Sequence, residues 1–285
     1  MPFDSAESRT SLKARPQTSL FDSFCFLNCL ACLILFSAIA PHLCEAQERE
    51  ESSKRFLRWM VNDPVAVMGD LDAEHFFMAG ATGIGISALS SYDQSSSRFF
   101  QRRYRNSGYL GVTNELGNIN LAAPLSALLF GTSLITDDLK FQDAAFTSFQ
   151  AVLNTHLTVG LAKYAFGRER PYQHPTPYRF NLLEQGATSF PSGHTATAFA
   201  LVTPWVVYYP NAFTYSLLAL PLSTGIARVA RGRHWLTDIT AGAMIGAWWG
   251  YTLSKRHLNI TEQNNVNIYP VLSDEVKGVS VSVSF

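Results

Sequence analysis

The sequence predicts an all-α protein, a helical bundle with a six-helix core, followed by a small C-terminal β-hairpin. Long apolar stretches of helical length recur between residues 75 and 254. Gly, Pro and charged residues separate these stretches, as expected of the connections between helices. Residues 267–285 switch to a period of two, which is typical of strands.

Composition limits the classes of function. The chain has 285 residues, and its 22 basic and 22 acidic residues give a formal net charge of zero. A neutral chain argues against a nucleic-acid binder, which needs excess positive charge to attract phosphate backbones. Apolar residues make up 47% and charged residues 15% of the chain, so composition leaves residence in a membrane open.

Residues 1–46 are predicted to be a secretory signal peptide. Three basic residues precede an apolar stretch at 24–40, and small residues end the segment at Cys44 and Ala46. The alternative is an uncleaved anchor, because this stretch of 17 residues, apolar apart from Asn28 and Ser37, is near the lower limit for a spanning helix. All four cysteines lie within the first 44 residues, so no later part of the chain can form a disulfide or a thiolate metal site.

Residues 47–74 are expected to form a linker with one short helix. Residues 47–55 are charged and expected to be mobile, and the amphipathic piece 56–60 leads to a break at Pro64. The first apolar helix is predicted at 75–91, and the SSYDQSSSR stretch after it is a loop by composition. The basic, aromatic RFFQRRYR stretch that follows is interpreted as a solvated helix face rather than a polyanion or lipid-headgroup surface.

The next two helices are predicted at 119–136 and 141–166. His156, within the second, has no further ligand three or four residues away, so it is interpreted as a core or surface histidine rather than a metal ligand. Residues 167–191 are a loop rich in Pro and Gly, and helices follow at 193–209, 212–230 and 234–254. Pro221 marks a kink or a start in the second of these three. We expect one domain at 75–256 and an appendage at 257–285 containing the hairpin.

Three clusters of polar residues interrupt this apolar sequence. Lys163 and Arg170 lie at the end of one helix, which Pro171 stops. Ser192 and Gly193 then precede an apolar helix, whose free amides can bind an anion, and His194 lies beside them, where it can exchange a proton.

The third cluster places Arg228, His234 and Asp238 within eleven residues. His234 and Asp238 are four residues apart, so on a helix the carboxylate can reach an imidazole nitrogen. Arg228 adds a permanent charge and a fork of donors suited to phosphate oxygens. Each cluster alone has a structural explanation. The Lys and Arg of the first can complement the helix dipole, the Ser and Gly of the second can cap a helix, and the His and Asp of the third can form a pair on a helix surface. Together they predict an anion-binding site with two histidines at the ends of three helices.

The three clusters resemble the signature of the type 2 phosphatidic acid phosphatase and vanadium haloperoxidase superfamily. That signature reads Lys-x6-Arg-Pro, then Pro-Ser-Gly-His, then Ser-Arg-x5-His-x3-Asp, and the chain matches it in order and spacing between residues 163 and 238. Ala227 departs from it, because it replaces the Ser before the third-motif Arg. We expect this change to weaken packing or hydrogen bonding near Arg228 without abolishing activity.

The resemblance implies a phosphatase mechanism that needs no metal and no cofactor. His234 would attack phosphorus to form a phosphohistidine, with Asp238 holding its other ring nitrogen. His194 would protonate the leaving oxygen and then activate water. The equatorial oxygens would be bound by the remaining site residues: Lys163, Arg170, Arg228, and the amides around Ser192 and Gly193.

The resemblance also implies substrates and a compartment. Lipid phosphates are the leading substrates: phosphatidic acid, phosphatidylglycerol phosphate, undecaprenyl diphosphate or a lipid A phosphate. The alternatives are a non-specific periplasmic acid phosphatase acting on soluble esters, a haloperoxidase, and an inactive envelope scaffold. Membrane relatives have six spanning helices with both ends of the chain inside the cell. A signal at 24–40 would instead deliver the start of the six-helix core to the outside, which does not fit this topology. This mismatch favours an exported, periplasmic or membrane-associated enzyme. An integral inner-membrane protein is the alternative, and the oligomeric state is not predicted.

Overall fold

The computed structural model describes residues 47–264 apart from 184–187, together with the backbone of two strands near the C-terminus. Side chains are described from residue 54 to residue 258. The predicted signal peptide at 1–46 lies outside the described residues. Within them the structure is mostly helical, as the sequence predicts.

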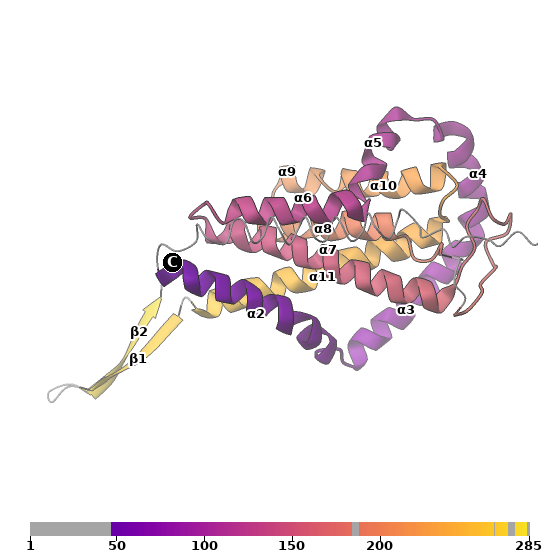
Figure 1. Ribbon diagram of the computed structural model, residues 1–285. Helices are drawn as coiled ribbons and strands as arrows, with labels where there is room; N and C mark the ends of the chain where they lie inside the picture. The colour runs from indigo at the N-terminus through magenta and orange to yellow at the C-terminus, as the bar shows by residue number, and fades with distance from the viewer. Residues whose placement is uncertain (1–46, 184–187, 265, 273–276, 284–285) are drawn as a thin grey trace, which may run out of the picture.

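Four long helices and a shorter one run side by side and form the bundle (Figure 1). They are α6 (Ile119–Ser133), α7 (Leu139–Phe166), α8 (Gly193–Tyr208), α10 (Ala219–Ala230) and α11 (Leu236–Asn264). The predicted helix at 212–230 is instead two helices, because α9 (Ala212–Ser216) ends before α10 begins. Pro221 lies in the first turn of α10, where its missing N–H is not needed for a helical hydrogen bond.

Two glycines let α11 approach α8 closely. A Cβ added to Gly242 would lie 2.4 Å from the carbonyl oxygen of Ser192, and one added to Gly246 would lie 2.0 Å from that of Ala196. Both distances are shorter than any van der Waals contact, so only glycine fits. The close approach holds the start of α8 against the first turns of α11.

The N-terminal part of the described chain differs from prediction. Residues 47–69 form one helix, α2 (Gln47–Gly69), which continues through Pro64. Its buried face carries Phe56, Trp59 and Val67 at helical spacing, and Phe56 and Trp59 pack against Phe146 of α7. Burial of these large side chains outweighs the hydrogen bond that a proline removes from a helix. The expectation of a break at Pro64 is therefore wrong, and the expected mobility of residues 47–55 stays a prediction.

The SSYDQSSSR stretch is also helical rather than a loop. A 3-10 turn, η2 (Ser90–Tyr92), joins α3 (Ala73–Leu89) to α4 (Asp93–Tyr104), and α5 (Gly108–Leu116) follows. Composition misled the prediction because Asp93 and Ser97, both polar, are buried in α4 against other polar groups. The basic stretch around Arg102 falls on α4, with its arginines mostly exposed.

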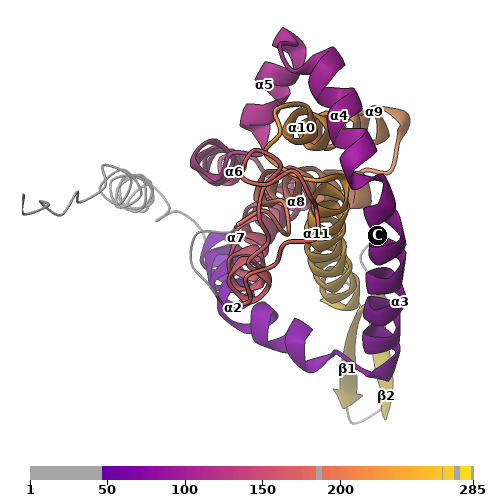
Figure 2. The same ribbon diagram turned by 90° about the vertical axis from the view of Figure 1, so that its right-hand side faces the viewer.

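Helix α3 lies at the outside of the bundle (Figure 2). None of its residues is buried, although its sequence is strongly apolar, and Phe76, Phe77 and Ile84 are among its exposed side chains. No helix among the described residues combines the length and the apolar character needed to cross a bilayer.

Helix α11 runs ten residues beyond the predicted end at 254, and two strands follow it. The strands β1 (Val266–Leu272) and β2 (Lys277–Val283) pair antiparallel, with Val266 opposite Val283. Residues 273–276, which would form the turn, lie outside the described residues, so the predicted hairpin stays a prediction.

Candidate active site

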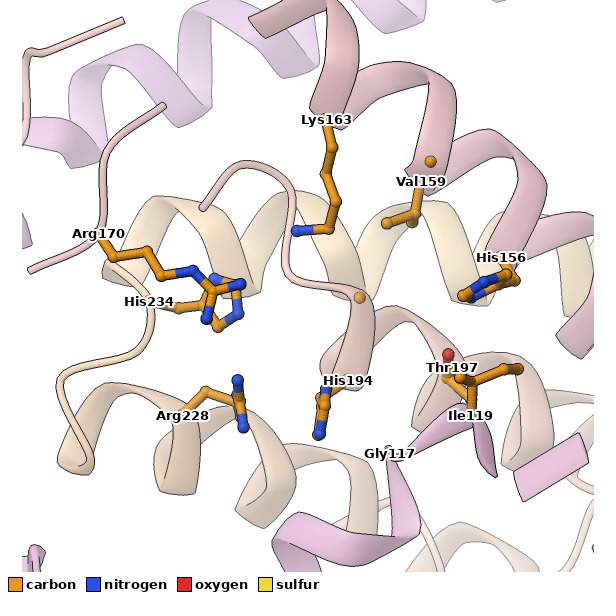
Figure 3. Close-up of a pocket in the computed structure, with 12 residues that line it drawn as sticks. Gly117, Ile119, His156, Val159, Lys163, Arg170, His194, Thr197, Arg228 and His234 are labelled. Carbon is orange, nitrogen blue, oxygen red and sulfur yellow. The ribbon is translucent and has the colours of Figure 1, made fainter. Parts of the chain in front are cut away.

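The predicted site residues meet at one end of the bundle, where α7 ends and α8 and α11 begin. Gly167 ends α7 in the left-handed conformation, with φ of 52°, one turn after Lys163. A pocket of about 300 Å³ opens there, and six of the eight predicted residues line it (Figure 3): Lys163, Arg170, Gly193, His194, Arg228 and His234. Ser192 and Asp238 are fully buried behind the lining.

His234 is buried, and its ring is oriented by a backbone carbonyl. Its Nδ1–H donates to the carbonyl oxygen of Ser189 at 2.7 Å. The nearest carboxylate oxygen of Asp238 is 3.5 Å from Nδ1, which is longer than a good hydrogen bond. Burial, reinforced by the charge of Lys163, lowers the pKa of His234 well below its usual value. The ring is therefore neutral, and the proton on Nδ1 leaves Nε2 with a free lone pair.

Asp238 reaches His234 mainly through Ser189. One carboxylate oxygen accepts from Ser189 Oγ at 2.5 Å and from the Trp235 amide at 2.8 Å. The other oxygen accepts from Arg168 Nη1 at 2.6 Å. Burial raises the pKa of Asp238, and these hydrogen bonds oppose that rise. We expected Asp238 to hold the second ring nitrogen of His234. In the structure the Ser189 carbonyl makes the short contact with this nitrogen, and Asp238 accepts a hydrogen bond from the Ser189 hydroxyl.

Three cations surround the pocket, as predicted from their spacing. Lys163 and Arg170 both donate to the carbonyl oxygen of Thr188, and Arg170 also donates to its hydroxyl at 3.1 Å. Arg228 donates to Asn114 Oδ1 of α5 at 3.0 Å. Burial lowers the pKa of Lys163 to about 7 and that of Arg228 to about 10, and the like charges nearby add to both shifts.

His194 faces the pocket from the first turn of α8, across from Arg228 (Figure 3). Burial and the charges of Arg228, Arg170 and Lys163 lower its pKa to about 3, despite an opposing contribution from Glu115. The amides of Gly193 and His194 have no acceptor among the described residues, so they are available to an anion. The Ser192 amide is not available, because it donates to the carbonyl oxygen of Asp238 at 2.9 Å.

Ala227 is fully buried and packs with Leu110 of α5 and Ala230. The next residue, Arg228, has a buried Nε with no hydrogen-bond partner among the described residues. The effect of lacking a serine hydroxyl at this position stays a prediction.

Several residues that support the site were not predicted from the sequence. Arg168 is buried and donates through Nη2 to Asp93 Oδ2 at 2.7 Å, as well as to Asp238. The position of Arg168, two residues before Arg170, could have drawn attention to it. Asp93 and Asn114 carry no such signal, because they lie on separate helices far from the motifs.

His156 lines the same pocket from α7, although it is more than one-third exposed. His156 was interpreted as a core or surface histidine rather than a metal ligand. It is exposed rather than in the core, and its place in the pocket wall was not predicted. No cluster of His, Cys, Asp and Glu side chains suited to a metal ion is present in the part of the chain that the structure describes.

Comparisons with known proteins agree with the motif resemblance. The PAP2 superfamily model matches residues 144–262, which include all three clusters. A lipid A 1-phosphatase of Porphyromonas gingivalis is 38% identical over 91 residues, which cover 31% of this chain and 18% of that protein. A lipid A 1-phosphatase of Rhizobium johnstonii is 30% identical over 105 residues, which cover 35% of this chain and 43% of that protein. The chain thus spans less than half the length of either relative.

A solved structure shares the fold. The transmembrane PAP2 type phosphatidylglycerolphosphate phosphatase of Bacillus subtilis superposes with a TM-score of 0.51 at 19% identity. The superposition covers 65% of this chain and 94% of that one. At this identity the likeness concerns the arrangement of helices.

Proposed function

We propose that this protein, whose residues 144–262 belong to the PAP2 superfamily, is a phosphatase that hydrolyses phosphate monoesters or diphosphates of lipids through a phosphohistidine. One observation carries the proposal: a lysine, two arginines and two histidines line a single pocket (Figure 3). A phosphate group needs cations around its oxygens, and its transfer needs a nucleophile and a proton donor.

His234 is the proposed nucleophile. Its Nε2 lone pair would attack phosphorus while the ester oxygen leaves on the opposite side, so an N–P bond forms as an O–P bond breaks. The ring becomes cationic in this step. The Ser189 carbonyl at Nδ1, with the Asp238 carboxylate behind it, would stabilise that charge.

His194 is the proposed acid and base. With a pKa of about 3, its ring is neutral at neutral pH when the pocket holds no anion. A bound phosphate would offset the charges of Arg228, Arg170 and Lys163, which raises the pKa of His194 and allows the ring to carry a proton. That proton would go to the leaving oxygen, and the neutral ring would then take a proton from the water that attacks the phosphohistidine.

Lys163, Arg170 and Arg228, with the amides of Gly193 and His194, would bind the equatorial oxygens. These groups are fixed before substrate binds, because Thr188 and Asn114 already hold the three cations. Preorganised charges stabilise the transition state without further rearrangement. The buried Ser192 contributes by placing the first turn of α8 rather than by its own amide.

A lipid phosphate is the preferred substrate class. The partial relatives are lipid A phosphatases, and apolar side chains are exposed around the bundle, including Phe76 and Phe77 of α3. Large exposed apolar surfaces mark contact with membranes or partners. We place the enzyme after export, at the periplasmic face of a membrane, and an integral inner-membrane enzyme is the alternative.

The test measures phosphate release by the purified full chain. Lipid A phosphate and phosphatidic acid in detergent micelles are compared with p-nitrophenyl phosphate, for the native chain and His234→Ala. We expect release from the lipids and loss in the variant, with unchanged circular dichroism. Preference for p-nitrophenyl phosphate would favour the soluble-ester enzyme, and no release from any ester would favour the scaffold.

A further inference from the structure

The pocket continues beyond the phosphate-binding groups to His156. His156 and Lys163 are seven residues apart on α7, which is two turns, so both lie on the same face about 10 Å apart along the helix axis. Figure 3 shows His156 on the far side of Val159 from Arg170. A group that contacts His156 is therefore too far away to be the phosphate itself.

The pocket wall between the two ends is mainly apolar. Val159 and Gly160 form its α7 side, and Ile119 of α6 and Thr197 of α8 line the part near His156 (Figure 3). An alkyl group attached to the phosphate would be accommodated here and could continue out between the helices.

His156 differs from the rest of this wall because its ring can form hydrogen bonds. The ring has no hydrogen-bond partner among the described residues, and only burial and the charge of Lys163 act on its pKa. Burial and the nearby charge of Lys163 lower its pKa, so the ring is neutral at neutral pH, with one donor and one acceptor nitrogen. A neutral ring suits an uncharged polar group better than a second phosphate.

We propose that His156 is a specificity-determining residue that hydrogen-bonds the polar linkage of the leaving group, an ester, amide or hydroxyl oxygen that lies between the phosphate and an acyl chain. The proposal rests on the proposed function, because it assumes that the phosphate occupies the cationic end of the pocket. This contact would favour substrates with a polar linkage between the phosphate and the alkyl chain over plain alkyl phosphates.

The first test compares kcat/KM for lysophosphatidic acid, which has such a linkage, with kcat/KM for dodecyl phosphate, which has none. His156→Leu should lower the ratio of the two values about five- to tenfold, through KM of the lysolipid, as expected for one lost hydrogen bond. His156→Gln should restore most of the ratio, because its amide can also donate and accept. Leu157→Ala, which alters an exposed neighbour outside the lining, should keep the native ratio.

A second measurement decides the question even if no ester is hydrolysed. Calorimetry with the native chain should show that a phosphonate analogue of lysophosphatidic acid binds more tightly than dodecylphosphonate. His156→Leu should remove about fivefold or more of that difference. The role of His156 would be overturned if His156→Leu left the kcat/KM ratio or the difference in phosphonate affinity unchanged. It would also be overturned if His156→Gln lost as much of either as His156→Leu. If the native chain hydrolyses no ester but still binds the lysophosphatidic acid analogue more tightly than dodecylphosphonate, and His156→Leu removes that difference, only the proposed function is overturned.

Discussion

Arg168 connects Asp238 to Asp93 in a fully buried arrangement. Nη1 of Arg168 donates to Asp238 Oδ1 at 2.6 Å, while Nη2 donates to Asp93 Oδ2 at 2.7 Å. Asp93 also accepts from the amide and the hydroxyl of Thr237, in the first turn of α11. The guanidinium thus joins α4 to the start of α11, where the proposed nucleophile is held.

Arg168→Met should lower both stability and activity. The change leaves two buried carboxylates without their cation, and breaking a buried ion pair from one side costs about 3–5 kcal/mol. We also expect kcat to fall at least tenfold, because Asp238 no longer holds Ser189 and His234 in place. Urea unfolding and phosphate release measure the two effects. Arg179→Met is the control. The Arg179 side chain is 60% exposed and its Nη1 is 3.9 Å from Oε1 of Glu169, so this ion pair contributes little to stability. Equal effects of the two changes would contradict this account.

Phosphate affinity should depend on pH through Lys163. Burial lowers the pKa of Lys163 to about 7, so the ammonium is charged below that pH and loses its proton above it. Affinity for a phosphate anion should therefore be highest below pH 7 and should fall as pH rises through that value. Bound phosphate shifts the transition upward, because it favours the charged amine.

The inhibition constant of inorganic phosphate, measured from pH 5 to pH 10, checks this expectation. Lys163→Arg should remove the loss of affinity that the native chain shows as pH rises through 7, because a guanidinium remains charged there. A native profile that stays flat up to pH 10 would rule out Lys163 as the titrating group.

Gly242→Ala should reduce activity more than it reduces helix content. The added methyl group would lie 2.4 Å from the carbonyl oxygen of Ser192, so the start of α8 must move away from α11. A shift of about 1 Å at a catalytic group can cost a hundredfold in rate. Gly83→Ala in α3 is the matched control, because no atom lies within 4 Å of its added Cβ. Comparable kcat values for the two variants would contradict the proposed close approach.

The sequence predicted the helices of the bundle better than those that cover it. Helices α7, α8 and α11 appear as long apolar stretches, and the motifs at their ends have fixed spacing. The first half of helix α4 was predicted as a loop because its buried Asp93 is polar, and the partners of Asp93, Arg168 and Thr237, are distant in sequence. Local composition cannot show that a polar residue will be buried in a satisfied network.

The same limit applies within the site. The spacing of the three clusters and their family resemblance predicted that the cations and both histidines lie together, and these residues line one pocket. The spacing could not show that the Ser189 carbonyl makes the short contact with His234, since that depends on the path of the loop before α8. Nor could it show that Asn114 of α5 holds Arg228.

Asp63→Ala should destabilise the fold while kcat stays within twofold of the native value. Asp63 Oδ2 lies 2.7 Å from His257 Nε2, and Thr147 Oγ1 lies 2.7 Å from Nδ1 of the same ring, so these buried groups tie α2 to α7 and α11. Removal of the carboxylate leaves buried polar partners unsatisfied, at a cost of about 1–3 kcal/mol. His257 is nineteen residues after Asp238 on α11, about 28 Å along the helix, so the pocket should not be affected.

The matched control for this prediction is Asp70→Ala. Asp70 also pairs with an α11 side chain, Arg256, at 2.9 Å, but its own side chain is 71% exposed. An exposed pair contributes about 0–1 kcal/mol, so this change should leave the urea midpoint nearly unaltered. Urea unfolding followed by tryptophan fluorescence measures both variants, because Trp59 stacks on His257 with ring centroids 3.9 Å apart. If the two variants unfold at the same urea concentration, the buried Asp63–His257 contact does not stabilise the packing of α2 on the bundle.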